Sequence, residues 1–269
     1  MVWPASVLIV GCGNMGGAML AGWLRAGVAP DRFTVVDRRM AEPPAGVELL
    51  REIPVGRVFD MVLLGMKPQA LDKAGAELLA LGGPETVVAS MLAGVELASL
   101  AERFPQARAL VRVMPNLSAA VGKSPMGLVA SGLDDAARAK VLAFFQPLGA
   151  PEWVGEDLFD AVTALAGCGP AFVYRFIDAL AAAGAALGLA EDQAQRLAQA
   201  TVDGAAALAA AAPVPPGELA RRVASPGGST QAGLNVLDAD GALAKLVLAT
   251  LTASRDRNAQ MGAEARAAK

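Results

Sequence analysis

Residues 7–16, VLIVGCGNMG, decide the fold of this chain: an apolar run leads directly into the pattern G-x-G-x-x-G, and a helical pattern follows. In a strand–turn–helix unit, Gly11 permits the tight turn, Gly13 lets the backbone approach a pyrophosphate, and Gly16 lets the helix pack against the strand. The start of the helix presents free N–H groups to the phosphates. The stretch predicts a dinucleotide site formed by Gly11, Gly13, Asn14, Met15 and Gly16, the alternative being a glycine-rich turn without a ligand.

An acidic residue, Asp37, ends the next apolar run, about 20 residues beyond the glycines, as in dinucleotide-binding domains. Its carboxylate would accept a hydrogen bond from the ribose 2′-hydroxyl, which favours NADH as the cofactor. Arg38 and Arg39 follow at once and could instead bind the 2′-phosphate of NADPH, or form a solvated loop. A carboxylate beside a phosphate costs on the order of several kcal/mol, so the two signals conflict. We expect Asp37 and Arg38 at the cofactor site, with NADH favoured and NADPH left open.

The first half of the chain alternates short apolar runs with helical patterns, which is typical of parallel βαβ units and a doubly wound sheet. We expect strands at residues 7–10, 34–37, 61–66, 86–90, 110–114 and 127–131. We expect helices at residues 14–26, 69–81, 97–103 and 134–145.

The pattern changes after Gly155, where alanine- and leucine-rich stretches predict helices and no strand, since alanine is the best helix former. We expect these helices at residues 158–187, 191–211, 217–223, 229–238 and 242–264. The prediction is an α/β protein in which residues 1–155 form a Rossmann-type dinucleotide-binding domain and residues 156–269 form an all-helical domain.

Composition excludes several kinds of chemistry. The 269 residues include no histidine, which removes Ser-His-Asp and Cys-His nucleophile systems and histidine metal sites, and no metal is predicted. With 23 basic and 26 acidic residues and no basic run, we expect no nucleic-acid partner. The longest apolar region, residues 161–190, is interrupted by Pro170, Arg175 and Asp178, so we expect no membrane span. The N-terminus does not resemble a signal peptide, and we expect a cytoplasmic protein.

Two further groups of residues follow predicted strands, at the sheet edge where ligands bind in doubly wound folds. Lys67 and Pro68 follow the run 61–66, and Lys67 could contact the cofactor or an anionic substrate, or be an exposed loop lysine. Asn116 follows the run 110–114 and offers a donor and an acceptor beside the nicotinamide, the alternative being a plain turn.

The run Ser225–Thr230, SPGGST, precedes a helical pattern in the second half of the chain. It combines backbone N–H groups with hydroxyl side chains, which suits a carboxylate or phosphate, although Ser and Thr are also ordinary N-caps. The run 167–171, GCGPA, places glycine and proline inside a helical pattern, which indicates close approach of another group or a kink. We interpret Cys168 as a small packing residue.

These runs together resemble pyrroline-5-carboxylate reductases. Residues 11–16, 67–69, 114–116, 167–171 and 225–230 follow the order of that family at similar spacing over nearly the whole chain. The resemblance implies NAD(P)H-dependent reduction of the cyclic imine Δ1-pyrroline-5-carboxylate to L-proline. It also implies a homodimer formed by the C-terminal helices, with dimers that can assemble into larger rings.

The resemblance also assigns roles to individual residues. Ser225, Ser229 and Thr230, with the backbone of Gly227 and Gly228, would hold the substrate carboxylate. Thr230 would be the catalytic residue near the imine nitrogen, donating a hydrogen bond or relaying a proton to that nitrogen while hydride passes to C5.

The chain departs from the family pattern at 117–118 (LS, commonly TP), at Ala166 and Cys168 (both commonly Ser) and at 212–213 (AP, often with a glutamate). These departures leave open a reductase of a related cyclic imine, such as a six-membered ring. A non-catalytic dinucleotide-binding sensor is the alternative from another class. A β-hydroxyacid dehydrogenase is disfavoured, because no lysine lies between Lys140 and Lys245 to serve as its catalytic lysine.

Overall fold

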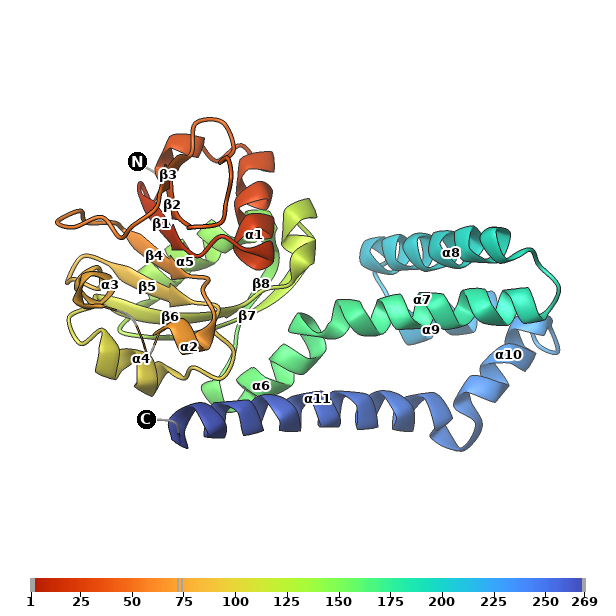
Figure 1. Cartoon of the computed structure of the whole chain (residues 1–269). Helices are drawn as coiled ribbons and strands as arrows, with labels where there is room; N and C mark the ends of the chain where they lie inside the picture. The colour runs from red at the N-terminus through yellow and green to blue at the C-terminus, as the bar shows by residue number, and fades with distance from the viewer. Residues whose placement is uncertain (1–2, 72, 74, 268–269) are drawn as a thin grey trace. The chain divides into compact units, whose positions relative to one another are not determined.

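The computed structural model describes residues 3–71, 73 and 75–267, and it divides into two compact units (Figure 1). The first unit comprises Met1–Cys168 and Ala253–Lys269, and the second comprises Gly169–Thr252. This division differs from the ranges 1–155 and 156–269, because the segment after Gly155 buries Phe159 in the core of the first unit. The two domains inferred from the sequence, residues 1–155 and 156–269, stay a prediction.

Eight strands of the described chain form one sheet in the first unit, in the order β3-β2-β1-β4-β5-β6-β7-β8. Every pair is parallel except β6 with β7, which is antiparallel. The predicted α/β class with a doubly wound sheet is confirmed. The strands are β1 (Val7–Val10), β2 (Phe33–Val36), β3 (Glu48–Leu50), β4 (Met61–Leu64), β5 (Val87–Ser90), β6 (Ala109–Met114), β7 (Ser124–Ser131) and β8 (Gly149–Trp153).

The central strands are buried on both faces, which explains why their sequences are continuous apolar runs rather than alternating ones. The helices α1 (Asn14–Arg25) and α5 (Asp135–Phe145) cover one face, where Trp23 stacks on Phe144 with ring centroids 4.6 Å apart. The indole nitrogen of Trp23 donates to the carbonyl of Phe144 at 2.8 Å. The helices α3 (Ala76–Ala80), α4 (Leu97–Arg103) and α6 (Phe159–Val162) bury apolar residues against the other face.

Strand prediction fails at the edges of the sheet. β3 has only three residues, none of them buried, and β8 contains Pro151 and alternates partly covered with exposed residues. Neither presents the buried apolar run by which the central strands are recognised. The antiparallel β7 also begins at Ser124, before the predicted residue 127.

Two predicted helices are wrong as single elements. The expected helix 69–81 is two short ones, α2 (Pro68–Leu71) and α3, because Gly75 adopts an extended conformation before α3. The expected helix 158–187 is a series of the 3₁₀ turn η4 (Glu156–Leu158), α6, the π-helical turn η5 (Thr163–Gly167) and α7 (Gly169–Ala186). The other 3₁₀ turns of the first unit are η1 (Pro30–Arg32), η2 (Leu117–Val121) and η3 (Gln146–Leu148).

The second unit is helical. After α7 come α8 (Glu191–Ala211), α9 (Pro216–Val223), α10 (Ser229–Asp238), the turn η6 (Ala239–Gly241) and α11 (Ala242–Ala267), which continues into the first unit. α7 and α8 pack together, and α8 buries only Ala194 and Ala198. No residue of α7, α9 or α10 is buried, and large apolar side chains such as Tyr174 (63%) and Leu208 (71%) are exposed. The apolar surface of this unit is therefore uncovered within one chain.

Candidate active site

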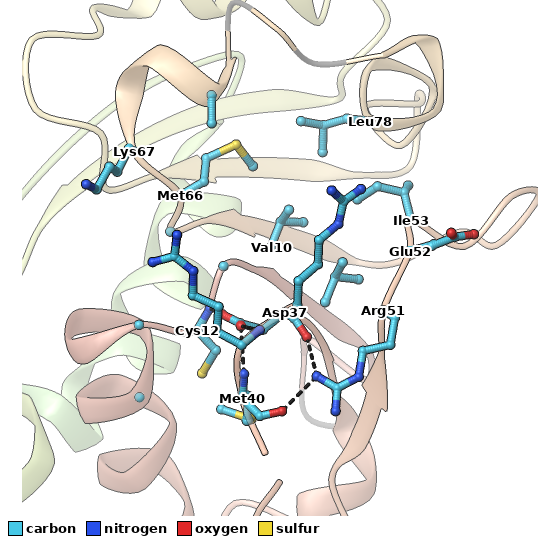
Figure 2. Close-up of a pocket in the computed structure, with 18 of the residues that line it drawn as sticks. Val10, Cys12, Asp37, Met40, Arg51, Glu52, Ile53, Met66, Lys67 and Leu78 are labelled. Carbon is cyan, nitrogen blue, oxygen red and sulfur yellow. Dashed lines mark hydrogen bonds between the residues drawn. The ribbon is translucent and has the colours of Figure 1, made fainter. Parts of the chain in front are cut away.

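A cleft of about 950 Å³ opens at the carboxyl ends of β1 to β4 (Figure 2). The strand order reverses between β1 and β4, and doubly wound sheets bind their ligands at this switch point. Six of the predicted cofactor residues line the cleft, whereas Met15, Gly16, Pro68 and Asn116 do not. The six are Gly11, Gly13, Asn14, Asp37, Arg38 and Lys67.

The three glycines after β1 occupy different surroundings. Gly11 has a φ of +85°, and a Cβ there would lie 2.9 Å from the backbone nitrogen of Met66. A Cβ on Gly16 would lie 2.9 Å from the carbonyl oxygen of Gly11, so this glycine allows α1 to approach the turn. A Cβ on Gly13 would meet no atom of the described residues within 4 Å. The space beside Gly13 is therefore open to a ligand.

The N-terminus of α1 faces the same cleft. Gly13 is the N-cap and makes no side-chain capping bond, and the first bond of the helix runs from the Gly17 N–H to the Gly13 carbonyl at 2.8 Å. The N–H groups of the first turn thus have no partner within the helix, as expected for a helix start. With the open space at Gly13, they fit the pyrophosphate of a dinucleotide.

The carboxylate of Asp37 accepts three backbone hydrogen bonds. Oδ2 accepts from the N–H of Cys12 at 2.8 Å, and Oδ1 accepts from those of Arg39 at 2.7 Å and Met40 at 3.0 Å. Partial burial raises the pKa of Asp37, but these three donors and the nearby Arg39 charge outweigh it and hold the pKa below its usual value. Asp37 is therefore ionised, and it ties the turn after β2 to the glycine loop.

Arg51 is a cleft residue that sequence reasoning missed. It follows β3, and its Nη1 donates to the carbonyl oxygens of Asp37 at 2.8 Å and Met40 at 2.7 Å. Figure 2 shows this guanidinium beside the turn after β2. The position of Arg51 at the carboxyl end of β3 could have indicated a cleft residue. However, β3 is an edge strand of three residues, and its sequence shows no apolar run from which a strand could be predicted.

Lys67 and Pro68 lie where β4 gives way to α2. Lys67 is exposed and lines the cleft, and Pro68 begins the helix, where its missing N–H costs nothing. Lys67 therefore offers the cleft an exposed cation.

Asn116 is buried, and both polar atoms of its side chain form hydrogen bonds within the protein. Oδ1 accepts from the Ser118 N–H at 2.8 Å, and Nδ2 donates to the Ala166 carbonyl at 2.8 Å. The backbone N–H of Asn116 donates to Oγ of Ser124 at 2.9 Å. These bonds give Asn116 a structural task, and its contact with the nicotinamide stays a prediction.

The predicted substrate residues all lie in the second unit. The Gly228 N–H donates to the Ser225 carbonyl at 2.9 Å, and Gly227 has a φ of +72°, which closes a turn before α10. Gly228 is the N-cap of α10, and no side chain caps the helix. Ser225, Ser229 and Thr230 are exposed. Gly228, rather than a serine or threonine, is therefore the N-cap of α10, and the substrate-binding role of the hydroxyls stays a prediction.

Comparison with known proteins identifies the family. The model described as "Pyrroline-5-carboxylate reductase dimerisation" matches residues 156–261. A pyrroline-5-carboxylate reductase from Aquifex aeolicus (strain VF5) is 36% identical over 239 residues, covering 87% of this chain and 89% of that protein. The chain belongs to the pyrroline-5-carboxylate reductase family. It is an oxidoreductase of the class that acts on a C=N bond, as predicted.

Solved structures of the family share this fold. A pyrroline-5-carboxylate reductase from Coxiella burnetii superposes with a TM-score of 0.87 at 28% identity, covering 96% of this chain and 98% of that one. The enzyme from Plasmodium falciparum, solved with NADP bound, superposes with a TM-score of 0.78 at 23% identity, covering 97% and 100%. The predicted Rossmann-type and helical parts are thus those of the family.

Proposed function

We propose that this chain reduces Δ1-pyrroline-5-carboxylate to L-proline with NADH or NADPH, the last step of proline synthesis. The observation that carries the proposal is the cleft at the β1/β4 switch point, where the uncapped start of α1 meets the open space beside Gly13. This arrangement suits a dinucleotide pyrophosphate, and the family membership supplies the substrate class.

The start of α10 is the proposed substrate-carboxylate site. Its first-turn N–H groups have no side-chain cap, and the hydroxyls of Ser229 and Thr230 are exposed beside them. A helix N-terminus of this kind favours an anion through free donors and the helix dipole. Ser225, with the backbone of Gly227 and Gly228, completes the loop around the carboxylate.

In this mechanism the residues of the chain bind and orient the cofactor and the substrate. The glycine loop and the first turn of α1 hold the pyrophosphate, and the start of α10 holds the carboxylate. The hydroxyl of Thr230 donates a hydrogen bond to the imine nitrogen and relays a proton from water to it, while the imine carbon, which becomes C5 of proline, gains a hydride. When bound, the reduced nicotinamide supplies the hydride. No step needs a histidine, which the chain lacks.

The exposed apolar helices are proposed to be covered by a second copy of the chain. The family match to a dimerisation domain supports oligomerisation, and α7 exposes Tyr174 and Phe176 at 63% and 51%. By length and composition the helical stretch Glu156–Ala186 could also cross a membrane. It begins where the dimerisation match begins, so we assign its apolar surface to the dimer. A larger ring, a cytoplasmic location and the lack of nucleic-acid and membrane partners belong to the same proposal.

The decisive experiment measures oxidation of NADH and NADPH at 340 nm with pyrroline-5-carboxylate as substrate. Rapid oxidation of either cofactor supports the proposal. The six-membered analogue Δ1-piperideine-6-carboxylate is assayed in parallel, because Leu117, Ser118 and Cys168 depart from the family pattern. Faster turnover of the six-membered analogue than of pyrroline-5-carboxylate would show that the analogue is the preferred substrate. Cofactor binding with no turnover on either imine would favour the sensor.

A further inference from the structure

The carboxylate of Asp37 has little capacity left for a ribose. An ionised carboxylate offers about four acceptor sites, and three are filled by the N–H groups of Cys12, Arg39 and Met40. A ribose that presents both its 2′- and 3′-hydroxyls would need two sites. The acidic side chain that favours NADH in the sequence is thus committed to the protein backbone.

Arg51 holds the turn in which Asp37 makes these bonds. Its Nη1 bridges the carbonyl oxygens of Asp37 and Met40, the first and last residues of the turn 37–40. The same turn contains Arg38 and Arg39, so the clamp also fixes the backbone that carries them. Arg51 reaches this turn from the neighbouring strand β3, since Asp37 and Leu50 pair through the Asp37 N–H at 3.2 Å.

Arg38, Arg39 and Arg51 all line the cleft. None of the three forms a salt bridge with any carboxylate of the described residues, whereas Arg57, on the loop that follows, pairs with Glu48 at 2.8 Å. Arginine binds phosphate through several N–H donors at once, more strongly than neutral groups do. The three N–H donors around Asp37 offset the repulsion that its carboxylate would exert on such a phosphate.

We infer that Arg51 is a specificity-determining residue that makes NADPH the preferred cofactor. It clamps the turn 37–40 so that Asp37 faces the glycine loop. Arg38 and Arg39 are then left to bind the 2′-phosphate. The inference rests on the proposed function for the use of a nicotinamide dinucleotide. It replaces the preference for NADH that Asp37 alone suggests.

The test measures cofactor binding without substrate, by fluorescence titration of NADPH and NADH against the wild-type protein. Competition by adenosine 2′,5′-bisphosphate and by adenosine 5′-monophosphate isolates the contribution of the 2′-phosphate. We expect NADPH to bind about tenfold or more tightly than NADH, since a hydrogen bond to a charged group contributes at least that factor. The double variant R38A/R39A should lose about tenfold in NADPH affinity and less than about threefold in NADH affinity.

Variants of Arg51 separate the clamp from the bulk charge of the cleft. R51A should reduce the NADPH-to-NADH preference by about tenfold, and R51K, which keeps the charge without the planar fork, should restore only part of it. R57A removes the same charge outside the cleft and should leave the preference unchanged.

Tighter binding of NADH by the wild type, or equal loss of both cofactors in R38A/R39A, would overturn the inference. A shift in R57A as large as in R51A would remove the special role of Arg51. Turnover of pyrroline-5-carboxylate is measured separately. A preference for NADPH without turnover would support the inference and overturn the proposed function. Turnover with a preference for NADH would support the proposed function and overturn the inference.

Discussion

The side-chain amide of Asn116 donates to the carbonyl oxygen of Ala166 at 2.8 Å and thereby joins the end of β6 to the π-helical turn η5. In a regular helix that carbonyl would accept from the residue four positions later, but this residue is Pro170, which has no N–H. Within the π-helical turn, the Cys168 N–H bonds the carbonyl five positions earlier, that of Thr163, at 2.9 Å. Asn116 therefore supplies the donor that the proline removes.

Replacing Asn116 by alanine should destabilise the protein. The change leaves the Ala166 carbonyl and the Ser118 N–H without their buried partners, which costs about 2 kcal/mol or more in the free energy of unfolding. We expect the melting temperature to fall by about 4–8 °C. Gln106→Ala, which removes an exposed amide in the same unit, is the control. An N116A variant as stable as this control would show that the bond contributes little.

The two glycines Gly13 and Gly16 should respond differently to substitution by alanine. A methyl group on Gly13 meets no atom within 4 Å in the described part of the chain, so G13A should keep its melting temperature. It should bind the cofactor about tenfold or more weakly, since the methyl occupies the space proposed for the pyrophosphate. G16A places the methyl 2.9 Å from the Gly11 carbonyl and should lose about 1–3 kcal/mol of stability. Thermal unfolding and cofactor titration separate the effects. Unchanged cofactor affinity in G13A would place the pyrophosphate elsewhere.

Cys12 should be an unreactive thiol despite its place in the glycine loop. Burial, and to a lesser extent the charge of Asp37, raises the pKa of Cys12 to about 11 from 9.0. Near pH 8 this leaves about a hundredfold less thiolate than an ordinary cysteine has, and the thiolate is the species that is alkylated. Iodoacetamide followed by peptide mass spectrometry should modify Cys12 only after urea unfolding. Rapid modification of the native protein would contradict the burial of this thiol.

The predictable part of the fold is the part with strong local signals. β1, β2, β4 and β5 are buried apolar runs, and the glycine pattern after β1 marks the start of α1. β3 and β8 depend on neighbouring strands for their extended backbone, which composition does not reveal. The break between α2 and α3 and the π-helical turn come from single glycine and proline positions, whose effect depends on tertiary bonds such as that of Asn116.

The candidate site divides in the same way. Gly11, Gly13, Asp37 and Lys67 were predicted from motifs, and all line one cleft. Arg51 was missed because it acts through backbone carbonyls across a strand pair that was not predicted. Hydrogen bonds to carbonyls depend on the folded backbone and leave no residue pattern in the sequence.

Thr230 is the residue on which the proposed chemistry depends most directly. Removing its hydroxyl in T230A should lower kcat/KM by about tenfold or more, because the imine nitrogen loses a hydrogen bond that strengthens as charge develops. T230S keeps the hydroxyl and should recover most of the activity. T201A is the matched control, since the Thr201 hydroxyl donates to the Leu197 carbonyl of its own helix at 2.8 Å. Steady-state kinetics, with cofactor affinity measured separately, distinguish a loss at the imine from a loss of binding, and wild-type kinetics in T230A would exclude Thr230 from the reaction.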